Sequence, residues 1–303
     1  MQKAVMDRNM RRVKHRQYLT GYLFLLPNFI CFLVFVFVPI LMGLGISFTD
    51  YNGFNKFNFV GLSNYASMFK DEYFRISLKN NILYTLGTVP VTVILALILA
   101  AVLNSNIKGK SFLRTLYFFP NISSMVAVGI VWGMLYNPSK GLINGVLGAL
   151  GVASTPKWLA SSSTALLSVM IVAVWKQLGY YMVILLSGMQ SIPKSLYESA
   201  ELDGANAVQR FFHVTIPLLS STLFMVIILM IIGSFQVFDL ISIMTDGGPG
   251  ASTNVLVYRI YQEGFKYLRF GFASAEAYFL FLIICVITLL QFIGQKKWVT
   301  YLD

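Results

Sequence analysis

Long apolar runs, separated by shorter polar segments, follow one another along this chain from Leu19 onward. A run of about 20 apolar residues is long enough for a helix to cross a bilayer. We place six such spans, over residues 19–48, 82–103, 115–136, 165–186, 217–240 and 277–293. Pro27 and Pro39 interrupt the first span, which membrane helices tolerate when neighbouring groups satisfy the freed backbone. The pattern predicts an all-α bundle of six transmembrane helices.

The composition agrees with a membrane protein. Hydrophobic residues make up 57% of the 303 residues and charged residues 12%, with a mean hydropathy of +0.71. Soluble domains have roughly a quarter of their residues charged. The net charge of +11 lies largely in short segments beside apolar spans, which indicates membrane orientation rather than nucleic-acid binding. Cys31 and Cys285 both lie inside spans without a metal-binding partner nearby in sequence, so we interpret them as packing residues.

Lysine and arginine predict which way the chain is inserted. They are densest in the N-terminal tail, in the second and fourth loops and in the C-terminal tail, which share one side of a six-span bundle. Because cytoplasmic segments are enriched in these residues, we expect both termini to be cytoplasmic. Residues 1–17 then form a cytoplasmic tail, and residues 18–303 form the transmembrane domain.

The fourth loop, between Ile192 and Ile216, differs from the rest of the chain. It has three acids, two bases and a histidine, where the chain otherwise avoids charge. Pro193 favours a helix start and Gly204 can end that helix with a positive φ, so the loop predicts a helix, a glycine turn and a second helix. Acidic residues surround the first helix, whereas helices that lie on anionic membranes are rich in lysine and arginine. The acids therefore favour docking to a protein.

The same loop resembles the signature of permease subunits of binding-protein-dependent ABC importers. That signature is Glu-Ala-Ala, three residues, Gly, nine residues, Ile, one residue and Leu-Pro. This chain has Glu198-Ser199-Ala200, then Gly204, Val214 and Ile216-Pro217 at the same spacing. Ser199 stands where the signature has its first alanine, Val214 where it has isoleucine, and Ile216 where it has leucine. These replacements are small or conserve volume, so we expect docking to be preserved.

Other stretches resemble the carbohydrate subgroup of these permeases, which takes di- and oligosaccharides or glycerol phosphate. The most informative is Thr245-Asp246-Gly247-Gly248-Pro249, followed closely by Ser252-Thr253. Within the subgroup the chain looks like the first of two non-identical permeases. The resemblance implies the six-helix fold of type I ABC importer permeases, with a core over about residues 78–293 and a cytoplasmic coupling helix.

The family implies partners and a place in the cell. A second, homologous permease completes the pathway, two copies of a cytoplasmic ATPase dock below it, and an extracytoplasmic solute-binding protein delivers the sugar. The protein is then a multi-pass component of a bacterial or archaeal cytoplasmic membrane. ATP and magnesium belong to the ATPase, so we expect no cofactor and no catalytic residue in this chain. The implied docking loop contains Tyr197, Glu198, Ser199, Ala200, Asp203, Gly204, Ala205 and Pro217.

Polar and aromatic residues near the spans are candidates for the translocation pathway. They are Lys176, Gln177, Tyr180, Gln236 and Asp239. A lysine inside a span is expensive unless it faces the bundle or water, so Lys176 either lines the path or holds helices or subunits together. Asp239 and Gln236 likewise have two possible roles: they either line the path or lie at the end of a helix. Tyr180 could stack on a sugar ring, although packing is the more ordinary role.

Two other classes of membrane protein could have a similar set of apolar spans. An ion-coupled secondary transporter typically has more helices, inverted repeats or several acids inside its spans, and this chain has few acids there. A membrane enzyme needs a cluster of catalytic side chains at one membrane face, and the sequence has none. The sequence therefore favours the importer, with the ion-coupled transporter as the alternative.

Overall fold

The computed structural model describes residues 2–54, 58–105 and 107–300, with side chains from Gln17 onward. In these ranges every regular element is a helix, apart from one isolated bridge between Thr49 and Phe59. The all-α prediction is confirmed for the described residues.

Four uninterrupted helical segments are long and apolar enough to cross a membrane. The first, residues 17–47, combines most of α1 (Gln2–Phe32) with the π-helical turn η1 (Leu33–Phe37) and α2 (Val38–Ser47). The others are α4 (Glu72–Asn104), α8 (Ala165–Gln190) and α15 (Phe270–Gln295).

Two further spans are broken. Helices α5 (Lys110–Ile122) and α6 (Met125–Leu135) meet at 97°, and the segment Ala207–Leu218 meets α12 (Ser220–Phe235) at 68°. Six spans result when each bent pair is one span, which agrees with the predicted number.

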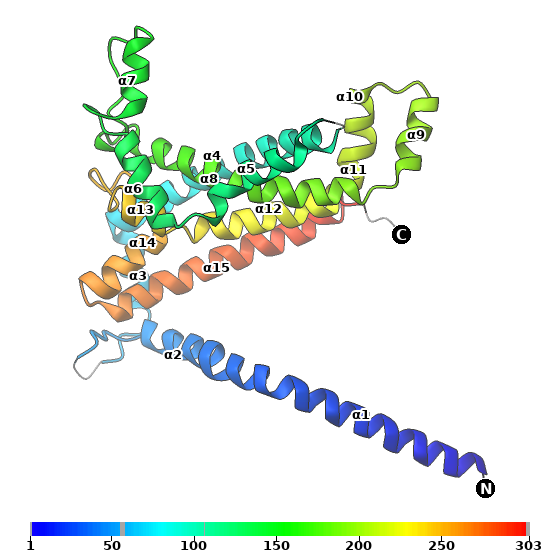
Figure 1. Ribbon diagram of the computed structural model, residues 1–303. Coiled ribbons are helices and arrows are strands. Elements are labelled where there is room, and N and C mark those ends of the chain that lie inside the picture. Colours follow the sequence, from blue (N-terminus) through cyan, green and yellow to red (C-terminus); the bar gives the residue numbers. More distant parts are fainter. Residues whose placement is uncertain (1, 55–57, 106, 301–303) are drawn as a thin grey trace.

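Short helices lie at the two ends of the long ones (Figure 1). One end has α3 (Ser63–Lys70), α7 (Leu142–Ala149), the 3-10 turn η2 (Trp158–Ala160), α13 (Asp239–Met244), α14 (Leu256–Tyr261) and the π-helical turn η4 (Gln262–Lys266). The opposite end has α9 (Lys194–Leu202), α10 (Ala207–Arg210), the π-helical turn η3 (Phe211–Thr215) and α11 (Ile216–Leu218). Both ends of the chain lie on the side of α9 (Figure 1).

Several predicted boundaries differ from the structure. The second span begins at Glu72 rather than at residue 82, because the Asp71 carboxylate caps α4 by accepting from the Phe74 backbone N–H at 2.8 Å. Helix α1 already begins at Gln2, so the predicted tail is helical. The fifth span ends at Phe235 and not at residue 240, since a separate helix starts at Asp239.

The bundle is centred on α4 and α8, and α12 and α5 pack around this pair. Small side chains at the contacts, such as Ala96, Ala100 and Ala173, are fully or almost fully buried, and they allow the helix backbones to approach closely. Three clusters of buried apolar residues form the core. One joins α4, α8 and α12, a second joins α4, α6, α8, α13 and α14, and a third joins α3, α4, α12, α14 and α15.

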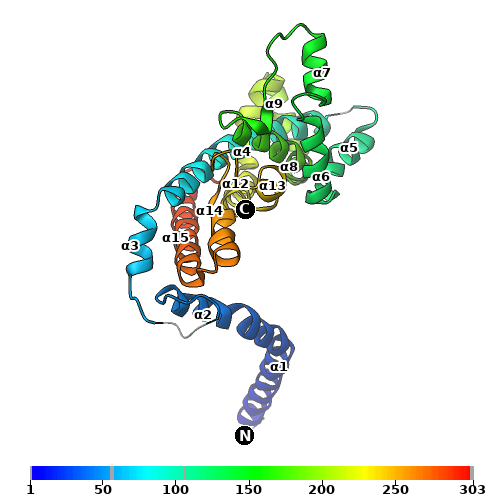
Figure 2. The ribbon, with the colours of Figure 1, turned by 90° about the vertical axis from the view of Figure 1, so that its left-hand side faces the viewer.

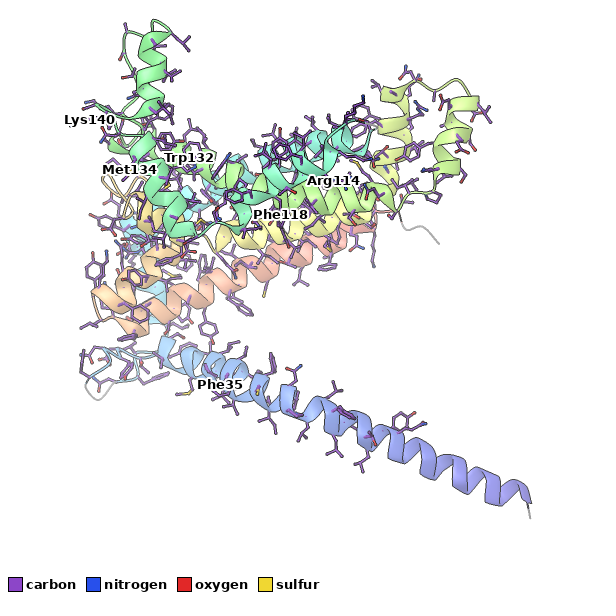
Figure 3. All side chains as sticks on the ribbon, viewed as in Figure 1. Phe35, Arg114, Phe118, Trp132, Met134 and Lys140 are labelled. Atoms are coloured by element: carbon purple, nitrogen blue, oxygen red, sulfur yellow. The ribbon has the colours of Figure 1, made fainter. Side chains whose placement is uncertain are left out.

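The first span leaves this bundle as an arm (Figures 1 and 2). Its α2 end lies against α15, where the Tyr278 hydroxyl donates to the Ile40 carbonyl, and α1 diverges from there. None of its most apolar stretch is buried within the chain, and side chains such as Phe35 point away from the ribbon (Figure 3). Such an apolar surface is suited to lipid or to a helix of another subunit.

Candidate functional site

The acidic loop forms the predicted helix, glycine turn and helix at one end of the bundle. Helix α9 starts directly after Pro193, and Gly204 follows its end with a φ of +82°. The Gly204 N–H donates to the Glu201 carbonyl at 3.0 Å, and the Ala205 N–H donates to the Ala200 carbonyl at 2.9 Å. This pair of bonds is the Schellman motif, which satisfies the last carbonyls of a helix.

A second cap turns the chain back toward the membrane. The Asn206 side chain accepts from the Gln209 N–H at 2.9 Å, and the Gln209 side chain accepts from the Asn206 N–H at 2.8 Å. This reciprocal capping box starts α10 at Ala207, and η3 and α11 then lead into α12. Pro217 lies in the first turn of α11, where its missing N–H costs little.

Two side-chain contacts fasten α9 to this returning segment. The hydroxyls of Tyr197 and Thr215 lie 3.0 Å apart, and Thr215 is buried at the start of the fifth span. Arg210 donates to Glu201 at 2.6 Å on the exposed side. Thr215 and Arg210 were not predicted as site residues, because their importance depends on the angle at which the two helices meet.

The outward side of α9 remains uncovered. Leu202 is 90% exposed, and Glu198, Ser199 and Asp203 are exposed beside it. Ala200 and Ala205 are partly buried against the returning segment. The loop is therefore a rigid hairpin that presents one exposed leucine and several carboxylates away from the bundle.

The five candidate pathway residues do not form one site. Lys176 is buried on α8 and reaches three backbone carbonyls at the break between α5 and α6, so it faces neither lipid nor an acid of this chain among the described residues. Gln177 is partly buried, and the Tyr180 ring packs edge-on against Tyr181. Gln236 ends α12 and Asp239 begins α13, both exposed at the other end of the molecule. These last two positions lie at helix ends.

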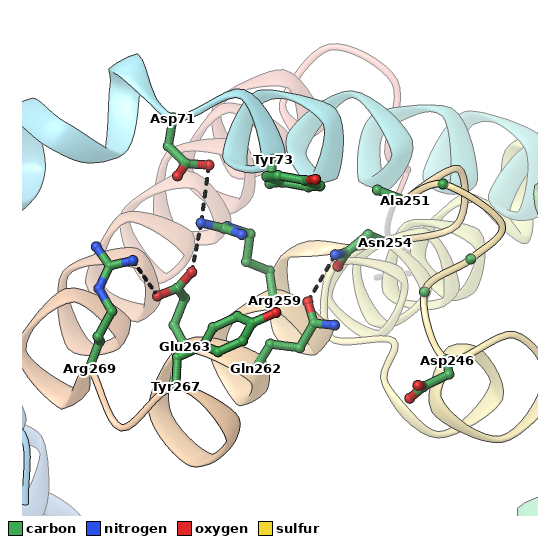
Figure 4. A pocket seen from close by; sticks show the side chains of 13 residues that line it. Asp71, Tyr73, Asp246, Ala251, Asn254, Arg259, Gln262, Glu263, Tyr267 and Arg269 are labelled. Carbon is green, nitrogen blue, oxygen red and sulfur yellow. Dashed lines mark hydrogen bonds and ion pairs between the residues drawn. The ribbon is translucent and has the colours of Figure 1, made fainter.

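A charged pocket at the α7 end was not predicted from the sequence (Figure 4). Its volume is about 530 Å³, and Arg259 lies in its wall with Nη2 3.0 Å from Asp71 and 2.8 Å from Glu263, while Nε donates to Glu276 at 3.0 Å. Arg269 also pairs with Glu263 at 3.0 Å. The network ties the start of α4 to α14, η4 and α15. The spacing of Arg259 and Glu263, four residues apart in an apolar chain, is the signal that could have indicated it.

The glycine-rich turn beside this pocket has its own bonds. The Thr253 hydroxyl lies 2.8 Å from both the Gly248 carbonyl oxygen and the Thr245 hydroxyl, and its single proton can be donated to either, which explains why the two threonines accompany the turn. The Tyr258 hydroxyl donates to Asp246, and Lys266 lies 3.2 Å from the same carboxylate. The hydrogen bond from Tyr258, followed by the charge and hydrogen bond of Lys266, lowers the pKa of Asp246.

Comparison with known proteins decides the family. Residues 81–298 match the model of the binding-protein-dependent transport system inner membrane component. The chain belongs to this family. It is 38% identical over 274 residues to the probable ABC transporter permease protein YurN of Bacillus subtilis (strain 168), which covers 89% of this chain and 94% of that one.

Other relatives have more specific names. The sn-glycerol-3-phosphate transport system permease protein UgpA of Agrobacterium fabrum is 34% identical, covering 92% of this chain and 96% of that one. The multiple sugar-binding transport system permease protein MsmF of Streptococcus mutans serotype c is 32% identical, covering 91% and 95%.

A solved structure shows the fold. It is a bacterial alginate ABC transporter in complex with an alginate pentasaccharide-bound periplasmic protein, and its matching chain superposes with a TM-score of 0.83 at 23% identity. The match covers 94% of this chain and 96% of the other.

These comparisons confirm that the chain is a permease with the fold of type I ABC importer permeases, and that it is a multi-pass inner-membrane subunit rather than an enzyme. They favour the importer over the ion-coupled alternative. No three His, Cys, Asp or Glu side chains in the described part of the chain lie close enough to hold a metal ion.

Proposed function

We propose that this chain is one of two permease subunits of an ATP-driven sugar importer, and that its cargo is a di- or oligosaccharide. The names of relatives support the substrate class, since they mention multiple sugars and sn-glycerol-3-phosphate. The second permease would cover part of the exposed arm formed by α1 and α2, and a solute-binding protein would dock at the α7 end.

The observation that carries the proposal is the uncovered but rigid hairpin at α9. Its helix is capped at its C-terminal end and tied to the fifth span, yet Leu202 and Glu198 contact nothing that would bury them. An exposed leucine beside carboxylates suits a groove of a cytoplasmic ATPase, which also binds the ATP and magnesium. The α9 end, with both chain termini, is then the cytoplasmic side.

The geometry also suggests how ATPase movement reaches the membrane. A push on α9 is transmitted through the Tyr197–Thr215 contact to η3 and α11, and from there to α12. Because packed helices move as rigid bodies rather than deforming continuously, such a push would rock the bundle between inward-open and outward-open states.

Reversal of one exposed charge tests the docking. In Glu198→Lys we expect the ATPase to be lost when the complex is purified from membranes, because the substitution places a cation where a carboxylate meets the groove. Glu72→Lys is the matched control, since Glu72 is also an exposed acid but lies at the opposite end of the bundle. Equal recovery of ATPase with Glu198→Lys and with the control would contradict the proposal.

The energy source is tested in vesicles that contain the assembled complex. Uptake of the sugar should require ATP on the α9 side and should persist when ionophores collapse the proton gradient. Uptake that follows a proton gradient without ATP would instead support the ion-coupled transporter.

A further inference from the structure

The third span is broken at a place where unpaired backbone carbonyls are energetically unfavourable. Helix α5 ends at Ile122, α6 begins at Met125, and the two axes differ by 97°. The last four carbonyls of any helix lack partners within that helix. In a bilayer no bulk water can satisfy them, and each unsatisfied group costs several kcal/mol.

Lys176 supplies the missing donors from a different helix. Its Nζ lies 2.7 Å from the Ser123 carbonyl oxygen, 3.0 Å from that of Pro120 and 3.4 Å from that of Asn121. An ammonium group has three N–H donors, so these three oxygens can use all of them. Its positive charge also faces the negative end of the α5 dipole, which is a favourable arrangement.

The reach of Lys176 is set by the contact between α5 and α8. Gly179, three residues further along the same face of α8, lies so close to α5 that a Cβ built on it would be 1.8 Å from the Tyr117 carbonyl oxygen. The two backbones therefore touch, and only glycine fits there. This contact places the end of α5 within reach of the lysine side chain one turn away.

We propose that Lys176 is a positioning residue that caps α5 and thereby holds the bend between α5 and α6. The side chain is only 6% exposed and its donors are already used, so a direct contact with cargo is disfavoured. Without the ammonium, the Pro120 carbonyl keeps only the bond from the Ser123 N–H at 3.3 Å. The Asn121 and Ser123 carbonyls then gain partners only if residues 122–125 become helical or if water enters. Either change alters the angle between the two halves of the span.

The bend also sets where α6 meets the α7 end of the molecule. Gly129 of α6 packs on Ile243 of α13, and a Cβ at Gly129 would be 2.6 Å from that side chain. A changed angle would break this contact. The consequence for transport rests on the proposed function, whereas the bend itself does not.

The bend is measured by spin labels at Phe112 on α5 and Met134 on α6, which are both exposed. They are introduced as cysteines in the full chain, assembled with its partners, after Cys31→Ser and Cys285→Ser. In Lys176→Met we expect the distance distribution between the labels to broaden and shift, and the kcat of uptake to fall at least tenfold. Lys176→Arg keeps the charge and the donors, so it should restore most of both.

Lys140→Met is the matched control, because Lys140 is an exposed lysine in the loop before α7 (Figure 3). If Lys176→Met does not accumulate in membranes, Lys176→Gln replaces it, and its two amide donors predict an intermediate broadening. Unchanged distances in Lys176→Met, or in Lys176→Gln when that variant replaces it, would overturn the inference, even if uptake fell. The two proposals can fail separately. If the distances change in Lys176→Met but the wild-type complex takes up no sugar with ATP, the proposed function is contradicted and the inference about the bend is not.

Discussion

At the scale of single residues, Gly204 shows most directly how local chemistry shapes the docking hairpin. Its φ of +82° lies in the left-handed region, and no other atom would meet an added Cβ within 4 Å. Only backbone strain, and no steric clash, therefore opposes a side chain at this position.

Gly204→Ala tests this strain. The left-handed conformation costs an alanine about 1 kcal/mol, which corresponds to roughly fivefold more frequent opening of the end of α9. Faster hydrogen exchange at 200–205 and weaker retention of the ATPase should result. Gly204→Asn serves as the control, because asparagine tolerates this conformation. Identical exchange in the alanine and asparagine variants would show that φ is not what shapes the turn.

Asp246 predicts a pH dependence in the glycine-rich turn at the other end. Its pKa is lowered by the Tyr258 hydroxyl and then by Lys266, so the folded carboxylate stays charged at lower pH than in the unfolded chain. The stabilisation is therefore complete above the unfolded pKa of about 3.9 and is lost as pH falls through the lower, folded value.

Hydrogen exchange of 245–253, corrected for its intrinsic pH dependence, should consequently rise below about pH 4. Asp246→Asn should remove this acid transition, whereas Asp239→Asn, at an exposed helix start nearby, should leave it in place. A transition that survives in Asp246→Asn would assign it to another group.

At the scale of elements, the Arg259 network explains how loops that lie far apart in sequence form one rigid end. Arg259, Glu263 and Glu276 are each less than 5% exposed, and together with Asp71 they join α4, α14, η4 and α15. Burying several charges is favourable only when they are paired and hydrogen-bonded.

Arg259→Met should therefore destabilise the protein by about 3–5 kcal/mol, since it leaves the Glu276 carboxylate buried without a cation. The melting temperature in detergent should fall by several degrees, whereas Arg75→Met, at an exposed position of α4, should change little. Adding Glu276→Gln to Arg259→Met should recover part of the loss, because it removes one uncompensated charge. A double variant no more stable than the single one would argue against an electrostatic cause.

At the scale of the whole molecule, the separation of the two ends predicts a topology. Leu202 in the α9 hairpin and Leu150 beside α7 are both exposed, and they lie at opposite ends of the bundle. With Cys31 and Cys285 replaced by serine, a membrane-impermeant maleimide should label Leu202→Cys only from the cytoplasmic side. Leu150→Cys should be labelled only from outside. Labelling of both from one side would refute the proposed orientation.

The sequence by itself determined the features that are local. Runs of apolar residues predicted the spans, because crossing a bilayer requires a length of helix that can be counted along the chain. Pro193 and Gly204 predicted the ends of α9, because each acts through its own backbone conformation. The spacing from Glu198 to Pro217 was sufficient to indicate the family, which the comparisons then confirmed.

Only the tertiary structure decided the features that join distant residues. The third span was predicted as one segment, and the structure divides it into α5 and α6. Lys176 lies beside the carbonyls at this break, although they are more than 50 residues earlier in the chain. The structural roles of Arg259 and Thr215 likewise depend on partners that belong to other elements. Apolar periodicity records which residues avoid water, but it does not record which buried polar group satisfies another, since that depends on how close the helix backbones lie. In this chain, Gly179 sets that distance.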